Sequence, residues 1–113
     1  MSENIFFPDS AMNLEVIEAD KVSRKIRARG GKMMMVEVFF EEGAIGYEHV
    51  HVHEQLCYCL EGEFEFSIEG KTTILKPGDS VFVPSSLVHG AKCLAAGRLL
   101  DIFTPQREDF LKA

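Results

Sequence analysis

The sequence predicts a single all-β domain, built as a sandwich or a barrel. Three observations lead to this prediction. The strand-like runs are short, turn residues separate them at close intervals, and only the C-terminal end offers a helical pattern. A chain of 113 residues can bury one hydrophobic core and is too short for two. Periodicity alone does not separate a sandwich from a barrel.

The clear strand candidates begin after residue 32. The run MMMVEVFF at 33–40 is rich in β-branched, aromatic and Met residues and ends at the loop signal 42–43. A second run, 55–60, ends at Glu61-Gly62. Apolar and polar residues then alternate over 63–68, which is the pattern of a half-buried strand.

The second half of the chain continues in the same way. Glu69-Gly70 predicts a hairpin turn, and Lys76-Pro77-Gly78-Asp79 is the strongest turn signal, since Pro presets one φ and Gly permits a positive one. Only a short helical turn is expected, at 108–111. The remaining strand candidates are 72–75, 80–83 and 99–103.

The whole chain, 1–113, is expected to be one domain, with a barrel over 31–113. Residues 1–30 form an N-terminal segment that packs on the barrel or on a dimer partner. This segment holds most of a basic cluster that acidic residues dilute, so a solvated strand or loop face is the favoured interpretation. The cluster consists of Lys21, Arg24, Lys25, Arg27, Arg29 and Lys32.

Charge and composition exclude several classes of partner. The formal net charge of −6 argues against nucleic acid, because binding requires neutralised phosphates. No apolar stretch approaches the ~20 residues that span a bilayer, and the first residues lack the features of a signal peptide. The three cysteines, Cys57, Cys59 and Cys93, are interpreted as small buried thiols, which together with the missing signal peptide predicts a cytoplasmic protein.

The segment 43–62 concentrates the candidate metal ligands. His49, His51, His53 and Gln55 share strand parity, so an extended chain would project all four from one face. Neutral imidazole suits Zn, Cu, Fe and Ni, and an amide oxygen adds an uncharged donor. A surface strand with exposed histidines is the alternative interpretation. The fourth histidine of the chain, His89, lies in a separate segment.

Two gapped motifs indicate a family. The pattern Gly43-x5-His49-x-His51-x3-Gln55-x6-Gly62 resembles the first motif of the cupin superfamily, with Gln where most members carry Glu.

The pattern Gly78-x5-Pro84-x-Ser86-x2-His89-x3-Cys93 resembles the second cupin motif, with Ser86 for the usual Gly and Cys93 for the usual Asn. Both of these departures fall on non-ligand positions.

The resemblance implies a double-stranded β-helix, or jelly-roll, barrel that holds one divalent metal ion, with Ni, Zn, Fe, Mn and Co as candidates. The implied ligands are His49, His51, Gln55 and His89. At His53 many cupins have a histidine that is not a ligand, although coordination or substrate contact stays open. Cys93 shares parity with His89, so its thiol either packs in the core or lies near the site. Gln in place of Glu removes one negative charge, which leaves a bound ion a stronger Lewis acid.

A closer resemblance extends over residues 25–113. The stretches HVHVHEQLCYCLEGEFEFSIEG and LLDIFTPQREDF are similar to the small cupins of pectin and alginate breakdown, which linearise 4,5-unsaturated uronate monomers. This resemblance implies a metal-dependent isomerase acting on a small sugar acid, with Asp101, Phe103 and Arg107 in the active site. A carboxylate can move protons, Arg can bind the substrate carboxylate, and Phe can wall the sugar ring.

Other interpretations stay open. Asp101 could be an ordinary rim residue, Phe103 a core residue, and Arg107 the partner of Glu108 or Asp109 in a surface ion pair. A non-haem metal dioxygenase would use the same histidines, and a non-catalytic module would bind a small metabolite. The family resemblance also leads us to expect a homodimer, with the apolar residues Ile5, Phe6, Phe7 and Pro8 available for its interface.

Overall fold

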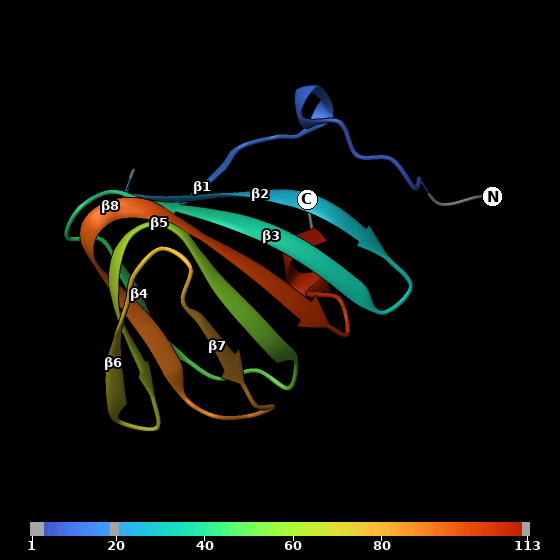
Figure 1. Cartoon of the computed structure of the whole chain (residues 1–113). Coiled ribbons are helices and arrows are strands. Elements are labelled where there is room, and N and C mark those ends of the chain that lie inside the picture. The colour runs from blue at the N-terminus through green and yellow to red at the C-terminus, as the bar shows by residue number, and fades with distance from the viewer. Residues whose placement is uncertain (1–3, 19–20, 112–113) are drawn as a thin grey trace.

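The computed structural model describes residues 4–18 and 21–111, and no side chain is described for Glu18. Eight strands and two short 3-10 helices make up these residues (Figure 1). The elements in chain order are η1 (Asp9–Ala11), β1 (Glu15–Glu18), β2 (Val22–Gly30), β3 (Met33–Phe40), β4 (Ile45–His49), β5 (Glu54–Ile68), β6 (Lys71–Leu75), β7 (Ser80–Val83), β8 (His89–Thr104) and η2 (Glu108–Leu111).

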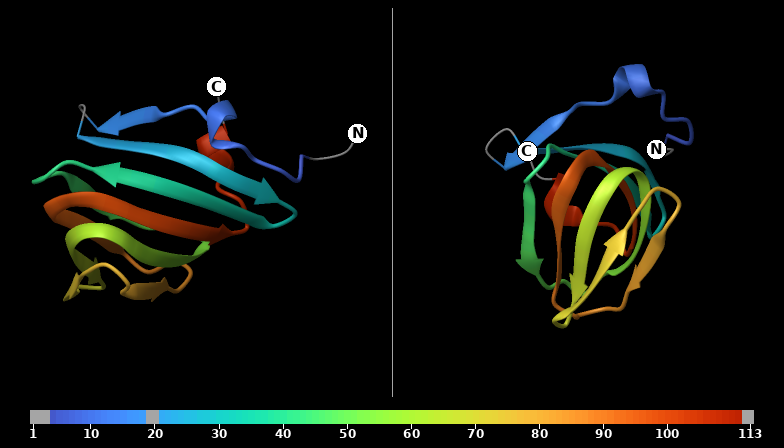
Figure 2. Two further views of the ribbon diagram at one scale, coloured as in Figure 1. Left: turned by 45° about the horizontal axis from the view of Figure 1, so that its top comes forward. Right: turned by 60° about the vertical axis from the view of Figure 1, so that its left-hand side comes forward.

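The strands form an antiparallel barrel of two facing layers, which the end-on view in Figure 2 shows. One layer has the order β1-β2-β3-β8-β5-β7, and the other has the order β4-β8-β5-β6. The long strands β5 and β8 belong to both layers, since each bends midway and continues in the opposite sheet. This bend closes the barrel and sets the metal-ligand candidates at one end of it.

Two glycines permit the bend because the two long strands approach closely there. Gly62 has a φ of +85°, which L side chains rarely adopt, and it lies against the backbone of β8. A Cβ on Gly97 would lie 1.9 Å from the carbonyl oxygen of Glu61, which no rearrangement of side chains can relieve. Backbone contact, rather than turn geometry, therefore requires Gly97.

Substituting Gly97 tests this account of the bend. We expect Gly97→Ala to lower the free energy of unfolding by about 3–5 kcal/mol, because β5 and β8 must separate. Gly70→Ala is the matched control: its φ is +81° but a Cβ there meets no atom within 4 Å, so only backbone strain of about 1 kcal/mol is added. Chemical denaturation measures both, and equal losses would contradict the close-approach argument.

The core lies between the two layers and follows strand alternation. In β3 the even-numbered residues face inward, from Met34 to Phe40, and in β5 Cys57, Cys59 and Phe64 are fully buried. A larger cluster fills the bent end of the barrel, and a smaller one, formed by Met34, Val36 and Phe103, lies near the opposite end.

The observed elements confirm the predicted all-β class, and the bounds predicted for β3 and β7 are those found. The helical turn at 108–111 is η2. The runs 55–60 and 63–68 are one bent strand, β5, and 99–103 is the second half of β8.

The N-terminal segment contains more structure than the sequence indicated. Within residues 1–30, β2 is a full strand of the larger layer, hydrogen-bonded to β3 along most of its length, and β1 extends that layer. Most basic residues of β2 form ion pairs. Arg27 pairs with Asp9 and with the buried Glu37, and Arg24 pairs with Glu15. Residues 4–14 lie outside the barrel (Figure 2).

Candidate metal centre

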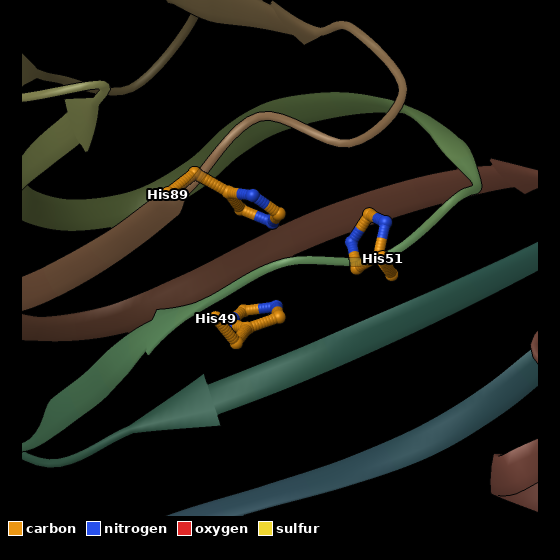
Figure 3. Close-up of side chains that lie close together, drawn as sticks. All are labelled: His49, His51 and His89. Carbon is orange, nitrogen blue, oxygen red and sulfur yellow. The ribbon is translucent and has the colours of Figure 1, made fainter.

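Three histidines converge at one end of the barrel. His49 ends β4, His51 follows in the next loop, and His89 begins β8, paired in register with His49. One ring nitrogen from each lies within 4.8 Å of the other two, and the rings face a common point (Figure 3). Three imidazoles at this spacing could hold a metal ion.

Backbone carbonyls orient all three rings. The Nδ1 atom of each histidine lies 2.9–3.0 Å from a carbonyl oxygen two residues away along the chain: His49 to Tyr47, His51 to His53, and His89 to Leu87. A carbonyl only accepts, so each Nδ1 carries the proton and each Nε2 keeps a lone pair. This outer set of hydrogen bonds fixes the tautomer that metal ligation needs.

Two of the three Nε2 atoms meet no proton donor within residues 4–18 and 21–111. The Nε2 of His89 is buried and has no hydrogen-bond partner among the described residues. The Nε2 of His51 lies 3.2 Å from Oε1 of Gln55, which is also an acceptor. Lone pairs that converge without a hydrogen between them fit a cation, so the donor set suits a divalent metal ion.

The local environment favours the neutral form of two of these histidines, His51 and His89. Burial lowers the pKa of His89 to about 4, and the nearby charges of His49, His51 and Arg107 act in the same direction. Burial likewise lowers the pKa of His51, helped by the charge of Arg107. Neutral imidazole is the form that binds metal, so protons compete little with a cation here at neutral pH.

Asp101 lies beside the histidines on the inner face of β8. It is paired in register with Cys57, and its Oδ1 atom has no hydrogen-bond partner among the described residues. Burial raises the pKa of this carboxyl group to about 6, while the Cys57 thiol, the Gln55 amide and Arg107 oppose the rise. Its pKa lies close to neutral, which suits a group that exchanges protons.

A cavity of about 470 Å³ connects these groups, with His49, His89, Gln55 and Asp101 in its lining. Phe103, on the inner face of β8, lines it beside Asp101, and the ring of Phe110 meets the Phe103 ring edge-on at 5.8 Å. Arg107 also lines the cavity. The volume is that of a small-molecule site.

Arg107 holds an ion pair as well. Its Nε and Nη2 atoms donate to the two carboxylate oxygens of Asp109 at 3.0 and 2.8 Å. The sequence allowed either a cavity residue or an ion pair with Asp109, and both descriptions apply.

The structure thus brings together all the site residues that the sequence indicated, except His53. Its ring lies outside the three-histidine group, and its contribution is the carbonyl that orients His51. Strand parity does not apply across His51 and His53, because β4 ends at His49 and both residues lie in the loop before β5. Cys93 is buried in the core cluster, where its thiol donates to the Ala95 carbonyl.

Among the cavity residues that the sequence did not assign to the site are Arg24, Asp109 and Phe110. Arg24 looked like one of several solvated basic residues. Asp109 and Phe110 belong to the C-terminal pattern, but no spacing rule indicates that η2 folds against the mouth of the barrel.

Among residues 4–18 and 21–111, no helix is long and apolar enough to cross a bilayer.

Comparisons with known proteins match both the fold and the sequence. The cupin domain model matches residues 36–103. The pectin degradation protein KdgF of Dickeya dadantii (strain 3937) is 44% identical over 94 residues, which cover 81% of this chain and 86% of that protein. The crystal structure of an RmlC-like cupin from Shewanella frigidimarina NCIMB 400 superimposes with a TM-score of 0.89 at 38% identity, covering 96% of each chain.

The structure of KdgF from Halomonas sp. superimposes with a TM-score of 0.87 at 36% identity, covering 93% of this chain and 98% of that one. Together these matches confirm the predicted jelly-roll barrel.

Proposed function

Because the chain belongs to the cupin family, we propose that it is a metal-dependent isomerase of pectin breakdown, which opens the ring of 4,5-unsaturated uronate monomers. The observation that carries the proposal is a buried carboxylate, Asp101, in one cavity with His49 and His89, two of the three converging imidazoles. The 44% identity with a pectin degradation protein supports the substrate class.

In this proposal His49, His51, His89 and the Oε1 atom of Gln55 hold one divalent ion. All four donors are uncharged, so the ion would keep its full positive charge and supply Lewis acidity toward a substrate oxygen. Such a site favours chemistry at a sugar oxygen over stabilisation of a higher oxidation state. We therefore favour ring opening of the sugar over a dioxygenase reaction with molecular oxygen.

Asp101 is proposed as the group that moves protons. Its carboxylate takes the proton of the anomeric hydroxyl, the C1–O bond to the ring oxygen breaks, and C1 becomes an aldehyde. The electron pair of the broken bond passes to the ring oxygen as an enolate at C5, and protonation at C4 gives the C5 ketone. Substrate and product have the same atoms, so no oxidant or second reactant is needed.

Phe103 and Arg107 are proposed to position the sugar. Phe103 offers an apolar ring face beside Asp101, and Arg107 offers a cation to the substrate carboxylate. Asp109 holds two of the Arg107 donor nitrogens, which fixes the guanidinium but leaves fewer donors for a ligand.

The test is the ultraviolet absorbance of the C4=C5 double bond in monomeric unsaturated uronate. We expect metal-loaded protein to remove this absorbance well above the spontaneous rate, and chelated protein to do so little. A metal-loaded protein that leaves the spontaneous rate unchanged would contradict the proposed function.

We further propose that the protein works as a homodimer in the cytoplasm, where its three buried cysteines would stay reduced. An apolar row crosses the outer face of the larger layer in register, from β2 through β3, β8 and β5 to β7. Two of its members, Leu56 and Phe82, are 52% and 53% exposed. The row consists of Ala28, Met35, Ile102, Leu56 and Phe82.

This outer row leads to a test of the dimer. We expect the wild type to sediment as a dimer and the double variant Leu56→Ser/Phe82→Ser as a monomer, because a sheet that is apolar on both faces is covered on both. Ile74→Ser, a change at an exposed residue of β6, should leave the dimer intact. A wild type that sediments as a monomer at tens of micromolar would contradict this proposal.

A further inference from the structure

Arg24 is a charged residue on the inner face of a barrel strand. Its position in β2 is paired in register with Val38, whose strand turns its even-numbered residues inward. The Arg24 side chain is only 14% exposed. It lines the candidate-site cavity together with His89 and Asp101.

Two contacts fix the guanidinium group of Arg24. Its Nε atom donates to Oε1 of Glu15 at 2.9 Å, across the β1–β2 pair. Its Cζ atom lies 3.6 Å from the centroid of the Phe110 ring, which is a close cation–π contact. The terminal atoms Nη1 and Nη2 make no hydrogen bond within the described parts of the chain. A held guanidinium with both terminal nitrogens available is prepared to bind an anion.

Arg107 lies against the same ring, but its hydrogen-bond donors are used differently. Its Cζ atom is 4.2 Å from the Phe110 centroid, and Asp109 occupies its Nε and Nη2 atoms as a bidentate partner. Glu15, the partner of Arg24, is an exposed residue. It accepts a hydrogen bond from the Nε atom of Arg24 alone. Arg24 therefore keeps the parallel pair of donors that matches a planar carboxylate, and Arg107 does not.

We propose that Arg24 binds the carboxylate of the sugar acid and sets the preference of the cavity for acidic over neutral sugars. This proposal rests on the proposed function for the identity of the ligand. Phe110 is a positioning residue, since its ring holds the guanidinium groups of Arg24 and Arg107 at the cavity wall. Arg107, proposed above as a cation for the same carboxylate, then contributes its charge and shapes the wall without binding the carboxylate directly, since Asp109 already holds two of its donors.

The first test separates KM from kcat. We expect Arg24→Gln to raise KM for the unsaturated uronate at least about tenfold, with kcat changed less than about threefold, because a remote carboxylate contact contributes to binding. Arg24→Lys should recover part of the loss in KM, since it restores the charge without the planar fork. An unchanged KM in Arg24→Gln would overturn the proposal.

A purely structural role for Arg24 makes a different prediction. If Arg24 only anchors β1, then Glu15→Gln, which removes the same ion pair and leaves the guanidinium, should raise KM as much as Arg24→Gln does. We expect Glu15→Gln to leave KM within about twofold of the wild type. A matching rise in both variants would overturn the binding role.

A binding measurement keeps this inference separate from the proposed reaction. By calorimetry, metal-loaded wild type should bind galacturonate more tightly than galactose, and Arg24→Gln should lose that difference. If the wild type binds galacturonate more tightly than galactose but does not linearise unsaturated uronate, the proposed function fails and the role of Arg24 stands. If the wild type binds both sugars equally, the role of Arg24 fails, whatever the turnover.

Discussion

Asp101→Asn should abolish turnover of unsaturated uronate while the protein stays folded and metal-loaded. The substitution keeps the shape of the side chain and removes its ability to take a proton. Because proton transfer contributes roughly 10²–10⁴-fold to catalysis, we expect kcat/KM to fall by about that factor. Steady-state kinetics on protein of measured metal content tests this, and Asp79→Asn, in an exposed turn, is the control.

The same variant should be more stable than the wild type at neutral pH when both are free of metal. Burial raises the pKa of Asp101 to about 6, above its ordinary value of 3.8, so the folded state binds more protons than the unfolded state between these values. Stability from this group is therefore lost as the pH rises from about 4 to 6. We expect Asp101→Asn to remove that loss, so that its free energy of unfolding at pH 7 is about 1–3 kcal/mol higher than that of the wild type.

Together these two results separate a catalytic role from a structural one. A structural carboxylate would destabilise the protein when it is replaced, because its partners would be left unsatisfied. Unchanged turnover in Asp101→Asn would contradict the assignment of Asp101 as the proton-transferring group.

His89→Ala should largely eliminate metal binding. His89 is the most deeply buried of the three histidines, and its Nε2 atom has no other partner in the described structure. Loss of an outer hydrogen bond to a ligand typically weakens metal binding 10–100-fold, so loss of a ligand should exceed about 100-fold. The metal-dependent rise in melting temperature should disappear with it.

His53→Ala is the matched control for that result. It also removes an imidazole, but from a residue outside the three-histidine group. The substitution leaves the His53 backbone carbonyl in place to orient His51. Metal content is measured by elemental analysis after dialysis. Equal metal content in His89→Ala and the wild type would contradict the proposed ligand set.

Much of the fold could be predicted from local pattern. The strands β3 and β7 and the turn 76–79 carry strong propensities, and the structure places them as expected. The bends of β5 and β8 could not be predicted, because they depend on the backbone of Glu61 meeting Gly97, a contact between residues distant in sequence.

The strand β2 could not be distinguished from a loop for a different reason. Four of its nine residues are Lys or Arg, which is typical of a solvated surface, yet Arg24 points inward and Arg27 pairs with the buried Glu37. Only tertiary partners distinguish such a charged strand from a loop.

The candidate site could be predicted as a set of residue types rather than as a geometry. Two gapped motifs indicated His49, His51 and His89, and the structure brings these together. Strand parity could not distinguish His53 from His51, since β4 ends at His49 and the loop that follows sets the positions of both. The position of Asp101 beside Gln55 depends on the register between β5 and β8, which the sequence alone does not state.

The central claim is that the metal-loaded site opens the sugar ring. Proton NMR of unsaturated uronate monomer in D₂O tests it most directly. We expect metal-loaded protein to remove the vinyl and anomeric ring signals faster than chelated protein does, and to yield a linear 5-keto product with deuterium at C4. A ring that persists at the spontaneous rate, or a product that has gained oxygen, would contradict it.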